Sequence, residues 1–185
     1  MKNFQRSNNL FSLCGLNCGL CPMHLDHYCP GCGGGPGNQP CAIARCSQQR
    51  GGLEYCYLCS EYPCEKYDGI DEFDSFIAHR LQLKDLQKAE KIGIEAYQAE
   101  LTEKMEILKY LLDNYNDGRR KSFFCLAVNL LELPDIKLVL EQIASETGSE
   151  NLTLKDKAIL AAGLFNTMAE KRNIVLKLNK KPKKK

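Results

Sequence analysis

Ten of the eleven cysteines lie within the first 64 residues, in a pattern that suits metal binding. Three pairs have the C-x2-C spacing: Cys18/Cys21, Cys29/Cys32 and Cys56/Cys59. At this spacing two thiolates can reach one ion from a single turn of backbone. Because the pattern recurs three times, we predict metal-ligand chemistry in this segment. The candidate metal ligands are Cys14, Cys18, Cys21, Cys29, Cys32, Cys41, Cys46, Cys56, Cys59 and Cys64.

A disulfide framework is the competing interpretation of so many cysteines. The N-terminus has no continuous apolar stretch and no small-residue cleavage site, so nothing marks the chain for secretion. No segment approaches the roughly 18 apolar residues of a transmembrane helix. We therefore expect a cytoplasmic protein without a membrane association. In that reducing compartment a cysteine cluster binds metal or carries redox chemistry more often than it forms disulfides.

Four cysteine pairs are enough for two tetrahedral sites, and the pairs can be combined into sites in two ways. We prefer joining in chain order, because Cys29 follows Cys21 closely enough to fold one pair onto the next. An interleaved arrangement stays open. Cys14 and Cys64 are then left over, as substitute ligands, as part of a third site or as buried thiols. In chain order the two sets are Cys18, Cys21, Cys29 and Cys32, followed by Cys41, Cys46, Cys56 and Cys59.

Zinc, at about two ions per chain, is the expected metal, because closed four-cysteine sites commonly hold it. Iron–sulfur clusters are the alternative, since they also accept thiolate-only ligation. The spacing of Cys14, Cys18 and Cys21 is that of radical S-adenosylmethionine enzymes, but the rest of the chain lacks the strand–helix alternation of their barrel. His24 and His27 are interpreted as polar residues of a loop or of a short helical turn, and His79 as a surface residue of a helix.

The cysteine-rich segment resembles an uncharacterised prokaryotic cysteine-rich family, a domain of unknown function. The resemblance covers residues 14 to about 66 and rests on the strings CGLNCGLCP, CPGC, CAIARCSQQRGGLEYCYLC and EYPCEK. The interval between Cys21 and Cys29 is shorter here than in some relatives. The family is similar to zinc-binding proteins, so the resemblance implies a class of cofactor and no particular activity.

Composition divides the chain into a predicted metal-binding domain at 1–68, a helical domain at 69–174 and a disordered lysine-rich tail at 175–185. Residues 1–68 have few large aliphatic side chains, so bound metal would have to supply folding energy. The tail holds six lysines and no acid, whereas residues 69–174 hold 14 basic and 18 acidic residues. Each four-thiolate zinc site would add roughly two further negative charges. Nucleic-acid binding therefore depends on the tail alone and is not favoured.

The segment after the cysteines has the apolar periodicity of a five-helix bundle. A short helix is predicted from near Asp71, followed by one long amphipathic helix from about 84 to 115. Residues 123–131 are apolar on nearly every side, which predicts a central buried helix with Cys125 as a core thiol. Pro134 begins the next helix, to about 145, and Thr153 caps a last one that ends near 172. The fold class is thus a small metal-stabilised cysteine-rich domain plus an all-α helical bundle domain.

Three cations precede the predicted buried helix, where its dipole disfavours positive charge. Arg119, Arg120 and Lys121 either pair with acids of the long helix, such as Glu106 or Asp113, or form an anion-binding site. No Ser-His-Asp or paired-carboxylate arrangement is recognisable, so an enzyme is not favoured.

The function expected from the sequence is that of an intracellular zinc-binding protein acting as a binding or interaction module. Its partner would be a protein or an anionic ligand. The alternatives are an iron–sulfur or thiol redox protein and a nucleic-acid-binding zinc protein.

Overall fold

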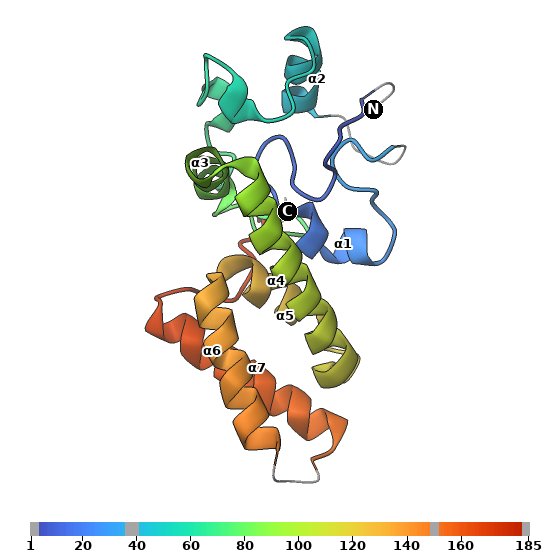
Figure 1. Ribbon diagram of the computed structural model, residues 1–185, viewed down its shortest axis with the longest axis vertical. Coiled ribbons are helices and arrows are strands. Elements are labelled where there is room, and N and C mark those ends of the chain that lie inside the picture. The colour runs from blue at the N-terminus through green and yellow to red at the C-terminus, as the bar shows by residue number, and fades with distance from the viewer. Residues whose placement is uncertain (1–3, 36–40, 149–151, 183–185) are drawn as a thin grey trace. The chain divides into compact units, whose positions relative to one another are not determined.

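The computed structural model describes residues 4–35, 41–148 and 152–182, and all regular structure in these ranges is helical (Figure 1). The helices are η1 (Cys18–Leu20), α1 (Pro22–Leu25), α2 (Ala42–Gln49), η2 (Cys56–Leu58), η3 (Glu65–Tyr67), α3 (Gln82–Ile92), α4 (Ile94–Tyr115), α5 (Lys121–Leu130), α6 (Leu133–Thr147) and α7 (Leu154–Lys171), where η denotes a 3-10 helix.

The chain forms two compact units. The first holds the described residues up to Leu101 together with 178–182, and the second holds 102–177, so the division falls inside α4. α3 and the first turns of α4 therefore belong with the cysteine-rich segment. The predicted limits at 1–68, 69–174 and 175–185 concern which parts can fold alone, and they stay a prediction.

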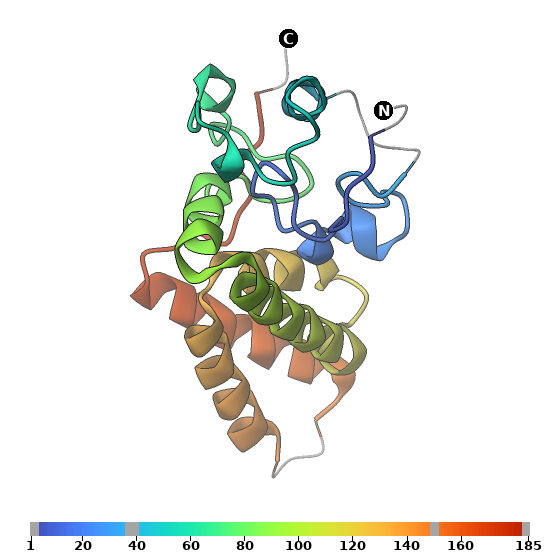
Figure 2. The ribbon, with the colours of Figure 1, turned by 45° about the horizontal axis from the view of Figure 1, so that its top comes forward.

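In the first unit, the cysteine-rich segment consists mainly of loops and short helices and packs against α3 and the start of α4 (Figure 2). The rings of Phe11 and Tyr97 pack with 4.5 Å between their centroids. The Tyr97 hydroxyl donates to Asn17 Oδ1 at 2.9 Å, and the Asn17 amide donates to the Asp85 carboxylate at 2.9 Å. Phe11, Asn17 and Tyr97 are all buried. The segment thus completes its apolar core with helices that follow it in the chain.

Part of the lysine-rich tail also belongs to the first unit, where residues 178–182 lie along the loop before α3. The Asn179 N–H donates to the Asp74 carboxylate at 2.7 Å, and the Asp74 N–H donates to the Asn179 carbonyl at 2.7 Å. The Lys180 ammonium lies 5.7 Å from the centroid of the Phe76 ring. The prediction of a disordered tail did not anticipate these contacts.

The second unit is a helical bundle centred on α5, in which every residue from Phe124 to Leu130 is buried. Phe124 packs edge to face against Phe165 of α7, with 6.0 Å between ring centroids. α6 and α7 lie side by side (Figure 1). Arg172, just after α7, donates to both carboxylate oxygens of Asp135 in α6 at 2.9 and 2.5 Å. Because Asp135 is buried, this bidentate ion pair compensates a carboxylate that has lost its water.

The helices predicted for the C-terminal part are confirmed from α5 onward. α5, α6 and α7 coincide with the predicted segments to within a few residues. Pro134 lies in the first turn of α6, and the Thr153 hydroxyl caps α7 by accepting the Asp156 N–H at 3.2 Å. The buried position of Cys125 is also as predicted.

Two helix predictions were wrong. The segment from Asp71 to Ile77 is irregular, and the Asp74 carboxylate accepts the His79 N–H at 2.7 Å, a local side-chain bond that competes with helix formation. The predicted continuous helix from 84 to 115 is two helices, α3 and α4. Gly93 interrupts it with a φ of 87°, a conformation that an α-helix does not allow. Apolar periodicity missed this break because it continues on both sides of Gly93.

Candidate metal centres

Nine of the ten cysteines of the first unit line one of two cavities. The smaller one, the Cys56 cavity, has a volume of about 30 Å³. The larger one, the Cys14 cavity, has a volume of about 180 Å³. Four cysteines line the Cys56 cavity: Cys46, Cys56, Cys59 and Cys64. Five line the Cys14 cavity: Cys14, Cys18, Cys29, Cys32 and Cys41.

Tight turns position the cysteines of the Cys56 cavity. η2 begins at Cys56, and the Cys59 N–H donates to the Cys56 carbonyl at 3.0 Å, which closes a turn between the two thiols. Cys64 directly precedes η3, and Cys46 lies in α2. The Cys56 N–H donates to the Leu13 carbonyl at 2.9 Å, so this turn is fixed to the loop that carries the first cysteine.

The Cys14 cavity is formed by the first loop, the start of η1 and the segment that follows α1. The Ser12 hydroxyl lies 3.2 Å from the Cys14 sulfur, within hydrogen-bonding distance. Cys18 begins η1. The Cys32 N–H donates to the Asn9 carbonyl at 3.1 Å, so the second C-x2-C pair is hydrogen-bonded to the N-terminal segment.

The electrostatic environment of these thiols is set mainly by burial. Burial raises the pKa of the Cys14 thiol to about 12 and that of Cys56 to about 11, because a thiolate loses its hydration there. It also raises the pKa of Cys18, Cys21 and Cys32 above the usual value. Neighbouring thiols add to the effect, since like charges oppose one another. A bound metal cation would have the opposite effect and lower the pKa of these thiols, because it stabilises the thiolate form.

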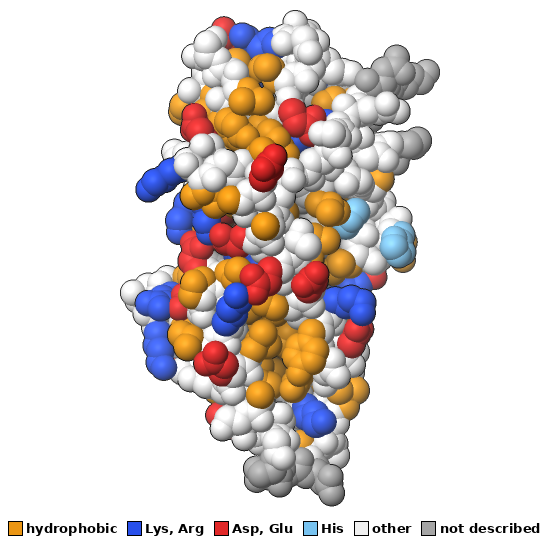
Figure 3. Space-filling view, viewed as in Figure 1, with side chains coloured by type: hydrophobic (Ala, Val, Ile, Leu, Met, Phe, Trp, Pro, Cys, Tyr) orange, Lys and Arg blue, Asp and Glu red, His pale blue; other side chains and the backbone are white. Residues whose placement is uncertain are grey.

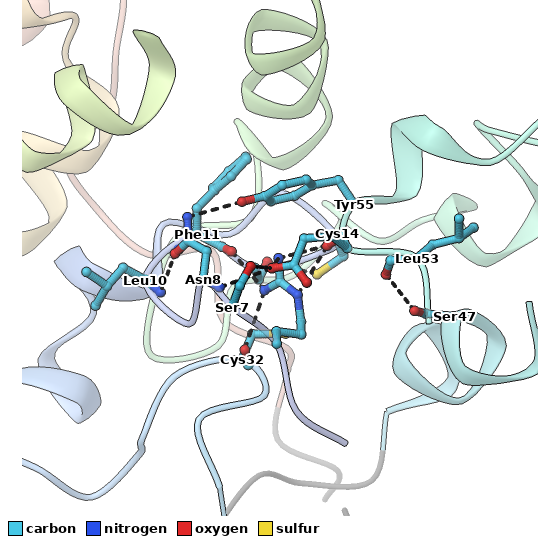
Figure 4. A network of polar contacts seen from close by, with 12 residues as sticks. Ser7, Asn8, Leu10, Phe11, Cys14, Cys32, Ser47, Leu53 and Tyr55 are labelled. Carbon is cyan, nitrogen blue, oxygen red and sulfur yellow. Dashed lines mark hydrogen bonds and ion pairs between the residues drawn. The ribbon is translucent and has the colours of Figure 1, made fainter. Parts of the chain in front are cut away.

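A buried guanidinium lies beside the Cys14 cavity. The Arg6 side chain is 2% exposed and donates to the Glu54 carbonyl at 2.8 and 3.1 Å and to the Phe11 carbonyl at 2.9 Å. Figure 4 shows Phe11 and Cys32 within this network. Burial raises the pKa of the Cys32 thiol, and the Arg6 charge partly offsets that effect. Arg6 was not predicted as a site residue, because nothing around it in the chain distinguishes it from a surface arginine.

The two cavities group the cysteines differently from the preferred pairing in chain order. Cys64, left over in that pairing, lines the Cys56 cavity, while Cys41 lines the Cys14 cavity apart from Cys46. Cys21 lines neither. Within residues 4–35, 41–148 and 152–182, no three Cys, His, Asp or Glu side chains are grouped so as to hold a single metal ion. The donor types and their number suit zinc, but binding would require the thiols of a cavity to draw together.

His24 and His27 have the polar roles that the sequence predicted. The His24 ring hydrogen-bonds the Cys29 carbonyl at 3.0 Å, and His27 is exposed. His79 differs from its prediction, because it is half-buried in irregular backbone. Its Nδ1 lies 3.1 Å from the Ile70 carbonyl and its Nε2 lies 2.9 Å from the Ser75 hydroxyl.

The cations at the start of α5 do not form the ion pairs considered from the sequence. Asp113 pairs with Lys109 at 3.1 Å instead. Among the described residues, the guanidinium groups of Arg119 and Arg120 form no ion pair, and Arg119 is exposed. Their backbone N–H groups donate to the side chains of Asp117 and Asn116 at 3.0 and 3.1 Å. Anion binding at Arg119, Arg120 and Lys121 stays a prediction.

Replacing Arg119 and Arg120 with alanine is expected to change the free energy of unfolding by no more than about 0.5 kcal/mol, because no ion pair is lost. If the two side chains bind an anion, inorganic phosphate should bind the wild-type chain and bind the double variant more weakly, as measured by calorimetric titration. Lys109→Ala serves as a control for the loss of positive charge. Absence of phosphate binding to the wild type would show that the anion-site prediction is wrong.

The surface and the helices bear on the other predicted partners. On the face shown in Figure 3, the described acidic and basic side chains are interspersed and do not separate into two patches. In the part of the chain that the structure describes, no helix is both long and apolar enough to cross a membrane. Nucleic-acid binding and a cytoplasmic location stay predictions.

Comparison with known proteins gives one match. Residues 10–69 match a family described as "Protein of unknown function (DUF3795)". This supports the resemblance to an uncharacterised domain family and extends it a few residues beyond the expected limits, up to the start of the loop before α3. No curated protein and no solved structure matches the chain. The match assigns no ligand or activity, so the chemistry has to be argued from the two cysteine cavities.

Proposed function

We propose that this chain is a zinc-binding protein that uses two separate thiolate sites to stabilise a binding or interaction module. The observation that carries the proposal is the convergence of cysteines on two cavities. Four cysteines from α2, η2 and the residues around η3 surround the Cys56 cavity. Its ligands would be Cys46, Cys56, Cys59 and Cys64. Those of the other site would be four of the five cysteines that line the Cys14 cavity, Cys14, Cys18, Cys29, Cys32 and Cys41.

The surroundings of the sulfurs support thiolate ligation. The Ser12 hydroxyl lies beside Cys14, the Arg6 guanidinium interacts with Cys32, and the Arg50 side chain interacts with Cys46. Hydrogen-bond donors and cations at these places stabilise a negatively charged sulfur and orient it toward a metal. A neutral thiol framework would gain much less from them.

The ligand count favours a structural role over a catalytic one. A zinc ion with four protein ligands has no open position for water or substrate, whereas catalytic zinc keeps one. The energy of metal binding would instead fix loops that have little regular structure of their own. The fixed loops would then offer a rigid surface to a partner.

A second candidate, an iron–sulfur cluster, is favoured by one property of the Cys14 cavity. Its volume of about 180 Å³ is several times that of the Cys56 cavity, and five cysteines line it. A cluster occupies more space than a single ion and also takes four thiolates. This candidate concerns only that cavity, so a protein with one zinc ion and one cluster would also be compatible with it.

Metal analysis of anaerobically purified protein tests the proposal. We expect about two zinc ions per chain and no visible absorbance, because zinc has a filled d shell. Iron with matching sulfide and a brown colour would support the second candidate. A chain that takes up neither metal when reduced, or that carries disulfides between these cysteines, would contradict both.

A further inference from the structure

The contacts of the lysine-rich tail with the loop before α3 have the form of peptide recognition. The main chains of residues 178–182 and of the loop segment 72–76 are joined at Asp74, whose N–H donates to the Asn179 carbonyl and whose carboxylate accepts the Asn179 N–H, both at 2.7 Å. The Asn179 side-chain amide donates to the Glu72 carbonyl at 2.6 Å. In peptide-binding sites main-chain bonds supply affinity and side-chain contacts supply specificity, and Asn179 makes both kinds.

The loop holds the Asp74 carboxylate in place through contacts of its own. This side chain is 1% exposed, and its other oxygen accepts the His79 N–H at 2.7 Å. The Arg80 guanidinium lies 3.7 Å from the carboxylate. A buried carboxylate oxygen is costly to leave without a hydrogen-bond donor. The loop therefore presents an acceptor that calls for a donor at the position where the tail supplies the Asn179 N–H.

The two lysines that follow in the tail each meet an aromatic ring of the same loop. The Lys180 ammonium lies 5.7 Å from the centroid of the Phe76 ring and donates to the Ser75 carbonyl. The Lys181 ammonium lies 5.9 Å from the centroid of the Phe73 ring. Such cation–π contacts favour a basic side chain over a neutral one. Three successive tail residues, Asn-Lys-Lys, thus each have a separate contact on the loop.

The charges of the two segments are complementary. Residues 68–76 hold four acidic residues and no basic one, whereas residues 177–182 hold three lysines and no acid. Opposite charges of this kind speed association and exclude acidic competitors. None of the loop residues 72–76 lines either cysteine cavity. The loop is therefore a second candidate site, which does not depend on bound metal.

We propose that the loop segment 72–76 is a recognition site for peptides that contain Asn-Lys-Lys, and that the chain's own tail occupies it in the free protein. The partner that fits the site is a protein with such a segment, which has to displace the tail. A tail on the same chain competes at a high effective concentration, so it keeps weak or incorrect peptides out. This goes beyond the proposed zinc sites, since it gives the interaction module a class of partner.

The test measures binding of a fluorescein-labelled peptide, VLKLNKKP, which repeats residues 175–182, by fluorescence polarisation. The receptor is the full chain with Asn179→Pro. Proline lacks the N–H that Asp74 accepts and the amide that Glu72 accepts, so the tail should leave the site. We expect this variant to bind the peptide and the wild-type chain to bind it roughly tenfold more weakly, because the intact tail competes.

Matched peptides and variants separate recognition from general charge attraction. Replacing asparagine with alanine in the peptide should weaken binding roughly fivefold, the loss expected for one hydrogen bond. A peptide of the same composition in shuffled order should bind more weakly still. In the Asn179→Pro chain, Phe76→Ala should weaken binding, whereas Tyr28→Ala, which removes another exposed aromatic ring of the first unit, should not.

Three results would overturn the proposal. They are no binding of the peptide to the Asn179→Pro chain, equal binding of the peptide and its shuffled form, and equal binding to the variant and the wild type. Light scattering adds a fourth. A wild-type dimer that Asn179→Pro dissociates would show that the tail binds a second copy of the chain instead of its own loop. The metal content of the samples enters none of these outcomes, so they are independent of the zinc proposal.

Discussion

Replacing Cys64 with serine is expected to reduce the zinc content from about two ions per chain to about one, because the Cys56 cavity then offers only three thiolates. We also expect the free energy of unfolding to fall by on the order of 3 kcal/mol or more, since metal binding and folding are coupled. Elemental analysis of the purified variant measures the first effect, and denaturant titration measures the second.

Cys21→Ser is the matched variant, because the two ways of grouping the cysteines predict opposite results for it. If the cavities define the ligand sets, Cys21 lines neither, and its replacement should leave about two zinc ions bound. If the cysteines pair in chain order, Cys21 is a ligand and Cys64 is not. Loss of zinc from Cys21→Ser with full retention by Cys64→Ser would therefore refute the grouping proposed here.

Replacing Gly15 with alanine is expected to destabilise the first unit strongly. Gly15 has a φ of 99°, and a Cβ at this position would lie 2.1 Å from the Gln82 carbonyl oxygen and 2.8 Å from the Leu86 side chain. The carbonyl belongs to the backbone of α3, so the contact can be relieved only by moving the helix away from the cysteine-rich loops. We expect a loss of about 3 kcal/mol or more in the free energy of unfolding.

Gly52→Ala separates the steric effect from the conformational one. Gly52 also has a positive φ, 79°, but no atom lies within 4 Å of the Cβ position. Alanine there should cost only the roughly 1–2 kcal/mol of a left-handed backbone conformation. Denaturation of both variants, followed by circular dichroism, gives the comparison. Equal losses would mean that the first loop does not pack against α3 as described.

The sequence by itself determined the cysteine-rich character of the N-terminal segment and the helical character of the rest. Cysteine density and C-x2-C spacing are local properties, so they identified the candidate ligands without a fold. Helices α5 to α7 were predictable for a similar reason, because apolar periodicity and caps such as Thr153 act within a few residues. The family match over residues 10–69 agrees with the resemblance drawn from the same local strings.

Only the tertiary structure decided which cysteines share a cavity. The Cys56 turn is anchored to the Leu13 carbonyl, and the second C-x2-C pair is anchored to Asn9, so the grouping depends on contacts between segments far apart in the chain. Spacing along the chain does not reveal such contacts, because the entropic cost of closing a flexible loop rises only slowly with the length of the loop.

The limits of the cysteine-rich unit also depended on tertiary packing. The sequence predicts a segment without a core of its own, in which bound metal supplies the folding energy. In the structure Phe11 packs on Tyr97, and Gly15 lies against α3, so helices after residue 81 supply the missing apolar surface. Composition counts what a segment contains and cannot include what its neighbours contribute. Burial against those neighbours, which is the dominant favourable term in folding, is decided by the whole chain.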